Sequence, residues 1–218
     1  MPQSIVIYGA GLLGQQLMVL MQSLYKGEYE VVSFIDERIG DCDNYLKTGL
    51  NVYGNLDSAI ASKCCSPEKV KLILAIGYSD LAARFNAFSQ AKSIGYKFLS
   101  LVHPSAIVSP EAEIGEGVFI GAGTIIDVSC KLGDANFIDA GCLIAERVAL
   151  NYGNYLAAKV VICGSTKVGS CNFFGATATI CNDLIIGDGN FINSQILLAR
   201  NLKDNSRVAE VRQIRVID

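Results

Sequence analysis

Three glycines near the N-terminus have the spacing of a phosphate-binding turn. Gly9, Gly11 and Gly14 form a complete G-x-G-x-x-G pattern directly after the apolar, β-branched stretch 4–8. Residues 12–24 follow with the apolar spacing of an amphipathic helix. In such a strand–turn–helix unit, backbone N–H groups at the start of the helix face an anion. The pattern therefore predicts a site for a phosphate group.

The next predicted strand supplies a second group for the same site. Residues 29–35 are mostly apolar and are followed by Asp36 and Glu37, where a carboxylate could accept hydrogen bonds from the hydroxyl groups of a ribose. Taken alone, the glycines and Asp36 indicate a dinucleotide site. The alternative is structural: a glycine turn that only packs the strand against the helix.

The other elements of the first hundred residues define the size of this unit. They are a short strand ending the polar stretch 41–53, a helix over 56–62, a strand over 70–76, a helix over 80–93 and a strand over 97–102. This set makes one mononucleotide-binding half, whereas a full dinucleotide fold uses two. Residues 1–102 are therefore predicted to form a Rossmann-like α/β half domain, which suits a nucleotide-linked sugar better than NAD.

The stretch from His103 to Leu198 divides into sixteen six-residue units without an insertion. The last residue of every unit is Ile, Val, Leu or Phe, a period that no α-helix could keep on one face. Units of six residues, three to a coil, are typical of a parallel β-helix, in which residues eighteen apart stack about 4.8 Å from one another.

Three columns with the eighteen-residue period support this interpretation. They are Gly115, Gly133, Asn151, Gly169 and Gly187; Asn136, Asn154, Asn172 and Asn190; and Phe119, Phe137, Tyr155, Phe173 and Phe191. The glycine column fits a corner that needs a positive φ. The aromatic column is predicted to pack between subunits rather than to bind a ligand.

The composition disfavours several other classes of function. The net charge of −3 and the sequence pI near 5.2 predict no basic surface for nucleic acid. The only histidine, His103, excludes a histidine-based metal site, and the eight cysteines match neither a disulfide framework nor a zinc motif. No apolar run has the length of a membrane span, and the chain begins with a strand rather than a signal peptide. We therefore expect a cytoplasmic protein that binds no metal, nucleic acid or membrane.

The two-part organisation, in which HPSAIVSPEAEIGEGVFIGAGTII leads from the half domain into the repeat, resembles the sialic acid O-acetyltransferase (NeuD) and PglD-type sugar-nucleotide acetyltransferase family. The resemblance covers nearly the whole chain and implies a left-handed β-helix over 103–198, followed by a tail over 199–218. It implies a homotrimer that binds acetyl-CoA as co-substrate in the groove between neighbouring β-helices. The implied acceptor is an amino or hydroxyl group of a nucleotide-activated or sialic-acid-like sugar, in surface polysaccharide biosynthesis.

The resemblance assigns sugar-nucleotide residues by position. Gly9, Gly11, Gly14 and Asp36 fall on the family's nucleotide-sugar loop and strand end. Gly77, which follows the predicted strand over 70–76, falls on its second phosphate-side turn.

On the acetyl-CoA side the resemblance assigns Tyr155, Gly175 and Arg212. Tyr155 stands where the family often has a second histidine. Arg212 belongs to a basic tail that could meet the phosphates of CoA. The alternative for this tail is a solvated cap over the last coil.

The family's catalytic pair is replaced in this chain. Members typically carry His followed by Glu in the unit that here reads AERVAL, so Glu146 and Arg147 stand at those positions. Three outcomes remain open: Glu146 takes the proton of the attacking sugar, the acceptor is an amine that needs little help, or transferase activity is lost. A covalent nucleophile among Cys142, Cys163 and Cys171 is a further alternative.

The prediction is therefore an acyl-CoA-dependent, most simply acetyl-CoA-dependent, sugar O- or N-acetyltransferase with Glu146 as the candidate catalytic residue. The first alternative is a catalytically inactive sugar-nucleotide-binding or scaffold protein of the same fold. The second is an NAD-binding module attached to a β-helix that oligomerises.

Overall fold

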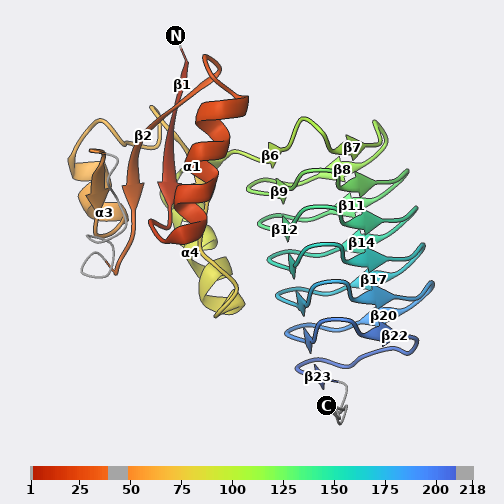
Figure 1. The fold of residues 1–218 in the computed structure, drawn as a ribbon. Coiled ribbons are helices and arrows are strands. Elements are labelled where there is room, and N and C mark those ends of the chain that lie inside the picture. The colour runs from red at the N-terminus through yellow and green to blue at the C-terminus, as the bar shows by residue number, and fades with distance from the viewer. Residues whose placement is uncertain (1, 39–48, 210–218) are drawn as a thin grey trace, which may run out of the picture.

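The computed structural model describes residues 2–38 and 49–209, which form two parts (Figure 1). The first part is a five-stranded, all-parallel sheet with the strand order β3-β2-β1-β4-β5. Its elements are β1 (Gln3–Tyr8), α1 (Leu12–Leu24), β2 (Tyr29–Ile35), β3 (Asn51–Tyr53), α3 (Leu56–Ala61), β4 (Lys71–Leu74), α4 (Leu81–Ile94) and β5 (Lys97–Phe98). The sequence predicts the helix over 12–24 and the strand over 29–35 with these same bounds.

Helices cover both faces of this sheet, because successive side chains along each strand point to opposite faces and both sets are apolar. Ile5 and Ile7 of β1 lie in a buried cluster with α1, whereas Val6 and Tyr8 lie in a cluster with α3 and α4. A parallel sheet buried on both faces needs apolar residues at successive positions. The run SIVIY meets that need.

The strand predicted over 97–102 is wrong as a single element. The structure divides it into β5, which pairs with β4, and β6 (Leu101–Val102), which pairs with β9 of the second part. The N–H of Leu99 still donates to Leu72, while the N–H of Leu101 already donates to Val118, each at 2.8 Å. The chain therefore passes directly from one sheet into the other.

The second part is a triangular stack of coils in which three parallel sheets form the sides, consistent with a β-helix (Figure 1). The aromatic face contains β6, β9 (Phe119–Ile120), β12 (Phe137–Ile138), β15 (Tyr155–Leu156), β18 (Phe173–Phe174), β21 (Phe191–Ile192) and β23 (Arg207–Val208). The aliphatic face contains β7 (Ile107–Val108), β10 (Ile125–Ile126), β13 (Leu143–Ile144), β16 (Val161–Ile162), β19 (Thr179–Ile180) and β22 (Leu197–Leu198). The mixed face contains β8 (Glu113–Ile114), β11 (Lys131–Leu132), β14 (Ala149–Leu150), β17 (Lys167–Val168) and β20 (Ile185–Ile186).

The predicted repeat accounts for the interior of the β-helix. In nearly every two-residue strand the second side chain is buried in one continuous apolar cluster, and the first side chain points outward. The stack continues past Leu198, because Leu202 bridges to Ile186 and β23 pairs with β21. At least part of the predicted tail therefore belongs to the last coil.

Four buried asparagines connect successive coils at the corner between the mixed and aromatic faces. The side-chain oxygens of Asn136, Asn154 and Asn172 each accept the backbone N–H of the asparagine eighteen residues later, at 2.7–2.9 Å. The side-chain oxygen of Asn190 likewise accepts the N–H of Ser206 at 2.7 Å. Each of these side chains therefore accepts a hydrogen bond from a backbone N–H group at the corner, where no strand supplies an acceptor.

The role predicted for the glycine column is wrong. Positive φ occurs two residues after that column, at Gly117, Gly153 and Gly189 and also at Ala135 and Cys171. In the predicted column a Cβ at Gly115 or Gly169 would instead overlap the carboxylate of the aspartate on the next coil. Glycine is placed there by the close approach of neighbouring coils and not by backbone conformation.

The aromatic face packs against the first part of the same chain. Tyr78 contacts Tyr155 and Phe173, with ring centroids 5.1 and 4.9 Å apart, and Leu81 joins Phe137 and Tyr155 in a buried cluster. The sequence predicts that the aromatic column packs between subunits. For the rings that Tyr78 and Leu81 cover, this prediction is wrong, because they pack against the N-terminal part of the same chain. In the described part of the chain, no helix is long and apolar enough to cross a membrane.

Replacing Asn172 by alanine tests the asparagine column. The change leaves the buried N–H of Asn190 without an acceptor, and we expect the free energy of unfolding to fall by about 2 kcal/mol. Denaturant titration followed by circular dichroism measures the loss. Asn151→Ala is the matched control, because its side chain is exposed on the same corner, and equal midpoints for the two variants would contradict the role.

Candidate functional site

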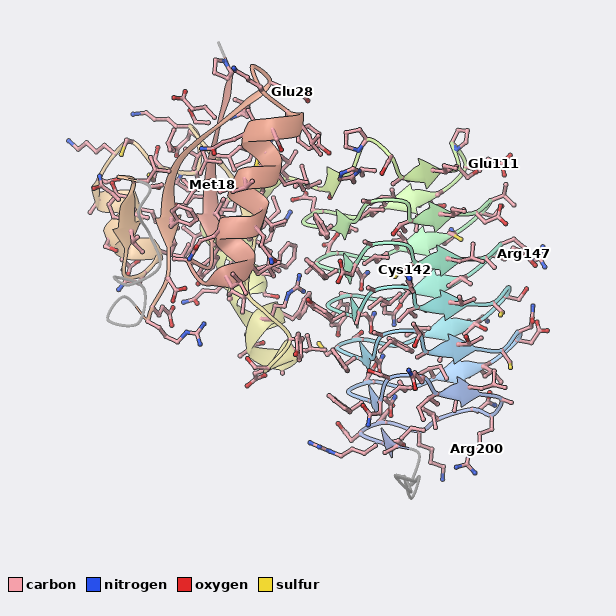
Figure 2. All side chains as sticks on the ribbon, in the orientation of Figure 1. Met18, Glu28, Glu111, Cys142, Arg147 and Arg200 are labelled. Carbon is pink, nitrogen blue, oxygen red and sulfur yellow. The ribbon has the colours of Figure 1, made fainter. Side chains whose placement is uncertain are left out.

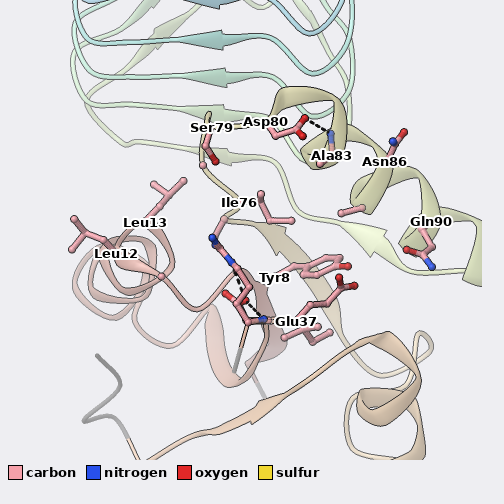
Figure 3. Close-up of a pocket in the computed structure, with 18 residues that line it drawn as sticks. Tyr8, Leu12, Leu13, Glu37, Ile76, Ser79, Asp80, Ala83, Asn86 and Gln90 are labelled. Atoms are coloured by element: carbon pink, nitrogen blue, oxygen red, sulfur yellow. Dashed lines mark hydrogen bonds and ion pairs between the residues drawn. The ribbon is translucent and has the colours of Figure 1, made fainter. Parts of the chain in front are cut away.

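A cavity of about 620 Å³ opens at the carboxyl ends of β1, β2 and β4, between α1 and α4 (Figure 3). The chain leaves β1 toward β2 and β3 on one side of the sheet and returns to β4 and β5 on the other. Ligands of open parallel sheets bind at such a switch in strand order. The volume is within the range of small-molecule sites.

The glycine turn forms one wall of this cavity. Gly9 has φ +117°, and a Cβ on it would lie 2.5 Å from the carbonyl oxygen of Ala75. A Cβ on Gly14 would overlap the carbonyl oxygen of Gly9, so Gly14 lets α1 pack against the turn from behind. Gly11 has open space around the Cβ position, so the backbone is accessible to a ligand there.

Two helices begin at the cavity, and their N-termini differ. Gly11 caps α1 without any side-chain hydrogen bond to the first-turn amides. At α4 the carboxylate of Asp80 accepts the N–H of Ala83 at 2.8 Å. Unpaired N–H groups and the positive end of the helix dipole therefore favour an anion at α1 and not at α4.

Asp36 lies in the cavity wall, but its carboxylate already holds the turn. The side chain is buried, and its two oxygens accept the N–H groups of Ala10 at 2.8 Å and Arg38 at 2.9 Å. The predicted contact with a ribose remains a prediction. Asp36 connects the end of β2 to the glycine turn and so sets the shape of the anion site.

Gly77 lies on the opposite wall, in the loop between β4 and α4. Four of the five sugar-nucleotide positions predicted from sequence, namely Gly9, Gly11, Asp36 and Gly77, thus line one cavity. Gly14 supports it.

Sequence reasoning placed Glu37 beside Asp36 as a carboxylate for a ribose, but it missed the other polar groups of the cavity. Tyr8 lines the cavity from the end of β1, and Asn86 and Gln90 line it from α4. Glu37 lines it just after the end of β2. Burial and the charges of Glu37 and Asp36 raise the pKa of Tyr8 to about 12, so the hydroxyl stays protonated at neutral pH. A signal existed in the sequence: Ala83, Asn86, Ala87 and Gln90 have the i, i+3, i+4, i+7 spacing of one helix face.

A buried arginine joins the cavity wall to the β-helix. Arg84 is fully buried, and its guanidinium donates to the carbonyl of Ile76, at 3.0 Å, and to the carbonyl of Ala135. Burial lowers its pKa to about 10, so it remains charged at neutral pH. Because Ile76 precedes Gly77 and Ala135 is a β-helix corner, Arg84 fixes the second wall relative to the coils.

Glu146 lies at the corner between the aliphatic and mixed faces. Its carboxylate forms an ion pair with Arg147 at 3.4 Å, and Arg147 Nε also donates to Ser165 Oγ at 3.2 Å. The side chain of Glu146 packs over Gly164, where a Cβ would lie 2.6 Å from Glu146 Cδ. Figure 2 shows Arg147 at the edge of the β-helix that points away from the N-terminal sheet.

Tyr155 and Gly175, two of the three positions predicted to bind acetyl-CoA, lie on successive coils of the β-helix. Tyr155 is 9% exposed and stacks on Phe137 under the N-terminal part. Gly175 lies at the corner between the aromatic and aliphatic faces, where a Cβ would overlap the N–H of Ser194 on the next coil. Arg212 lies outside the described residues. The three predicted roles therefore remain predictions.

The three candidate cysteines, Cys142, Cys163 and Cys171, give no support to covalent catalysis. Burial raises the pKa of the Cys142 thiol to about 12 and also raises the pKa of Cys163 and Cys171, which disfavours the reactive thiolate.

Within residues 2–38 and 49–209, no group of three or more His, Cys, Asp or Glu side chains could hold a metal ion.

Comparison with known proteins identifies structures with the same fold. No protein-family model matches the chain, and no curated protein matches it significantly. The acetyltransferase domain of PglB from Neisseria gonorrhoeae, solved with acetyl coenzyme A, has a TM-score of 0.81 at 23% identity over 96% of this chain and 97% of that one. A point mutant of perosamine N-acetyltransferase from Caulobacter crescentus, with CoA and GDP-perosamine, has a TM-score of 0.78 at 24% identity over 94% and 92%.

A third structure, WeeI from Acinetobacter baumannii, has a TM-score of 0.70 at 19% identity over 94% of this chain and 96% of that chain. At these identities the likeness shows a shared fold over both parts of the chain. By name, one of the three is the acetyltransferase domain of PglB and another is a perosamine N-acetyltransferase. The structure of the first contains acetyl-CoA and that of the second contains CoA.

Replacing Arg84 by methionine tests the connection between cavity and β-helix. The change leaves two carbonyls without their donor, and we expect the free energy of unfolding to fall by about 3 kcal/mol. Amide hydrogen exchange should also accelerate more in residues 76–79 than elsewhere in the chain. A general loss of stability would accelerate exchange in all regions and would not single out this loop. Lys97→Met, a change of an exposed cation, is the control, and unchanged exchange in 76–79 of the Arg84 variant would contradict the role.

Proposed function

We propose that this protein transfers an acyl group, most simply acetyl, from acyl-CoA to an amino or hydroxyl group of a nucleotide-activated sugar. The proposal treats the N-terminal sheet as a Rossmann-like mononucleotide-binding half and the second part as a left-handed β-helix. The observation that carries it is the cavity at the uncapped N-terminus of α1, formed by a glycine turn at a switch in strand order. The shared fold with acetyltransferases solved with acetyl-CoA or with CoA and GDP-perosamine supports it.

In this proposal the phosphates of the acceptor, the nucleotide-activated sugar, lie against the backbone at Gly11 and the first turn of α1. Asp36 keeps the turn in shape through Ala10, and Gly77 leaves room on the opposite wall. The sugar then extends from the cavity toward the thioester. Surface polysaccharide biosynthesis in the cytoplasm is the setting that we propose for such a product.

The reaction needs a proton acceptor and close positioning of the reactants. The sugar nitrogen or oxygen attacks the thioester carbonyl, a C–N or C–O bond forms, the C–S bond breaks and CoA leaves as the thiolate. The acceptor proton passes to a base and then to CoA. We assign Glu146 as that base, because a carboxylate accepts protons and Gly164 leaves space for it above the next coil. Proximity of the reactants supplies the rest of the acceleration.

The cavity is lined by residues of the N-terminal part, whereas Arg147, the neighbour and ion-pair partner of Glu146, lies at the edge of the β-helix that points away from that part (Figure 2). We therefore propose that a homotrimer completes the site, with acetyl-CoA in the groove between neighbouring β-helices. The outward column of the aliphatic face suits the contact, because Ile107, Ile125 and Leu197 are 65%, 40% and 70% exposed. The aromatic face is less available, since Tyr78 and Leu81 already cover its middle.

One observation favours a second candidate, a protein that binds the sugar nucleotide or CoA without turnover. Arg147 is ion-paired with Glu146 at 3.4 Å, so the candidate base already has a charged partner within its own chain. An acceptor amine that loses its proton to water is the third possibility, because it needs no base from the protein.

Turnover of acetyl-CoA with nucleotide amino sugars, followed by release of the CoA thiol, separates these candidates. With Glu146 as base, Glu146→Gln should lower kcat about 100-fold or more, with little change in the KM of either substrate. Glu111→Gln is the control, because Glu111 is exposed on the same edge of the β-helix. Unchanged turnover would exclude the carboxylate base, binding of acetyl-CoA without turnover would favour the second candidate, and absence of binding would contradict the transferase.

Sedimentation velocity tests the proposed trimer. The double variant Ile107→Lys and Ile125→Lys places two cations on the aliphatic face, and we expect it to sediment as a 23.3 kDa monomer. Ile185→Lys is the control, because Ile185 is 59% exposed on the mixed face. A double variant that sediments like the unmodified protein would exclude the aliphatic face as the interface.

A further inference from the structure

The cavity has a second end, on the α4 side of the sheet. Tyr8 and Ile35 belong to the buried cluster under α3 and α4, whereas the glycine turn leads to α1 on the opposite face. Ala83 and Ala87 of α4 line this end, and their short side chains leave space for a flat ring. A nucleotide with its phosphates at α1 would extend its base toward this end.

Two polar groups face this end and have no hydrogen-bond partner among the described residues. Burial, together with the charges of Glu37 and Asp36, raises the pKa of Tyr8 to about 12, so its hydroxyl stays protonated at neutral pH. Glu37 is exposed on the cavity wall, and Figure 3 shows its side chain beside that of Tyr8. The hydroxyl can donate a hydrogen bond, and the carboxylate can only accept.

We propose that this pair selects guanine, with the Glu37 carboxylate accepting from N1–H and the N2 amino group while the Tyr8 hydroxyl donates to O6. The inference rests on the proposed function of the cavity as a nucleotide site and adds the identity of the base. Guanine is the nucleobase that presents one acceptor followed by two adjacent donors on one edge. Two parallel N–H···O bonds to a carboxylate are the strong, charge-assisted kind.

The same pair discriminates against the other bases. Uracil has one N–H between two carbonyls, so its second carbonyl would face a carboxylate oxygen and repel it. Adenine and cytosine each place a ring nitrogen acceptor next to the amino group, and that acceptor would also face the carboxylate. The side-chain amides of Asn86 and Gln90 line the same cavity. If these amides and not Glu37 contact the base, they can complement uracil, and the experiment below separates the two cases.

Calorimetric titration of the full chain with GDP, IDP, UDP, ADP and CDP tests the proposal. We expect GDP to bind about 10- to 100-fold more tightly than UDP, since hydrogen bonds to a charged group are worth that much. IDP lacks only the N2 amino group, so its affinity should fall between the two. UDP binding as tightly as GDP would overturn the choice of guanine and leave the nucleotide site intact. If no nucleoside diphosphate binds, both the inference and the nucleotide part of the proposed function fail.

Two variants assign the discrimination to the named atoms. Glu37→Gln should weaken GDP about 10-fold or more and leave UDP unchanged or tighter. Tyr8→Phe should weaken GDP and UDP by similar factors, because both bases offer a carbonyl to the hydroxyl. Glu30→Gln, at the exposed amino end of β2, is the matched control and should change neither affinity. A Glu37→Gln variant that keeps the full preference for GDP would overturn the role of Glu37.

Discussion

Hydrogen bonding between successive eighteen-residue coils is the constraint on which the second part of the structure depends. Every coil must match the previous one at each strand, because the N–H groups of one coil donate to the carbonyls of the next. Asn154 and Asn172 extend this match into a corner that strands leave unpaired. Identical geometry at every level places side chains eighteen residues apart in columns, so a residue type that recurs with this period, such as the rings of the aromatic face, forms a continuous surface.

The chemical character of each face decides what it can contact. Rings such as Tyr155 give the aromatic face a surface that packs against Tyr78 and Leu81 of the N-terminal part. Arg84 then fixes the relation between cavity and coils by donating to a carbonyl on each side. As a result the cavity lies against one face of the triangle, and Glu146 lies at the corner farthest from it. In the proposed reaction, cavity and corner must therefore come from different subunits.

Much of the fold was predictable from local pattern, and the failures have specific causes. The repeat predicted the buried column of every coil, and the glycines with Asp36 predicted the cavity wall. The glycine column was misinterpreted because glycine allows either a positive φ or a close approach, and Gly115 uses the second. The segment 97–102 was misinterpreted because an apolar run does not show which sheet it joins. Tyr8 was missed because it belongs to no motif, whereas Glu37 was predicted, beside Asp36, only as a carboxylate for a ribose.

The sequence by itself determined the period, the core and the anion-binding turn, since these depend on residues close in the chain or on exact repetition. Spacing alone encodes them, and no knowledge of distant contacts is needed. Only the tertiary structure decided that the N-terminal sheet covers the aromatic face, that Asp36 holds the turn through Ala10, and that Arg84 reaches Ala135. These contacts join segments whose separation follows no period, so their positions emerge only when distant segments pack together, within the N-terminal part or between the two parts.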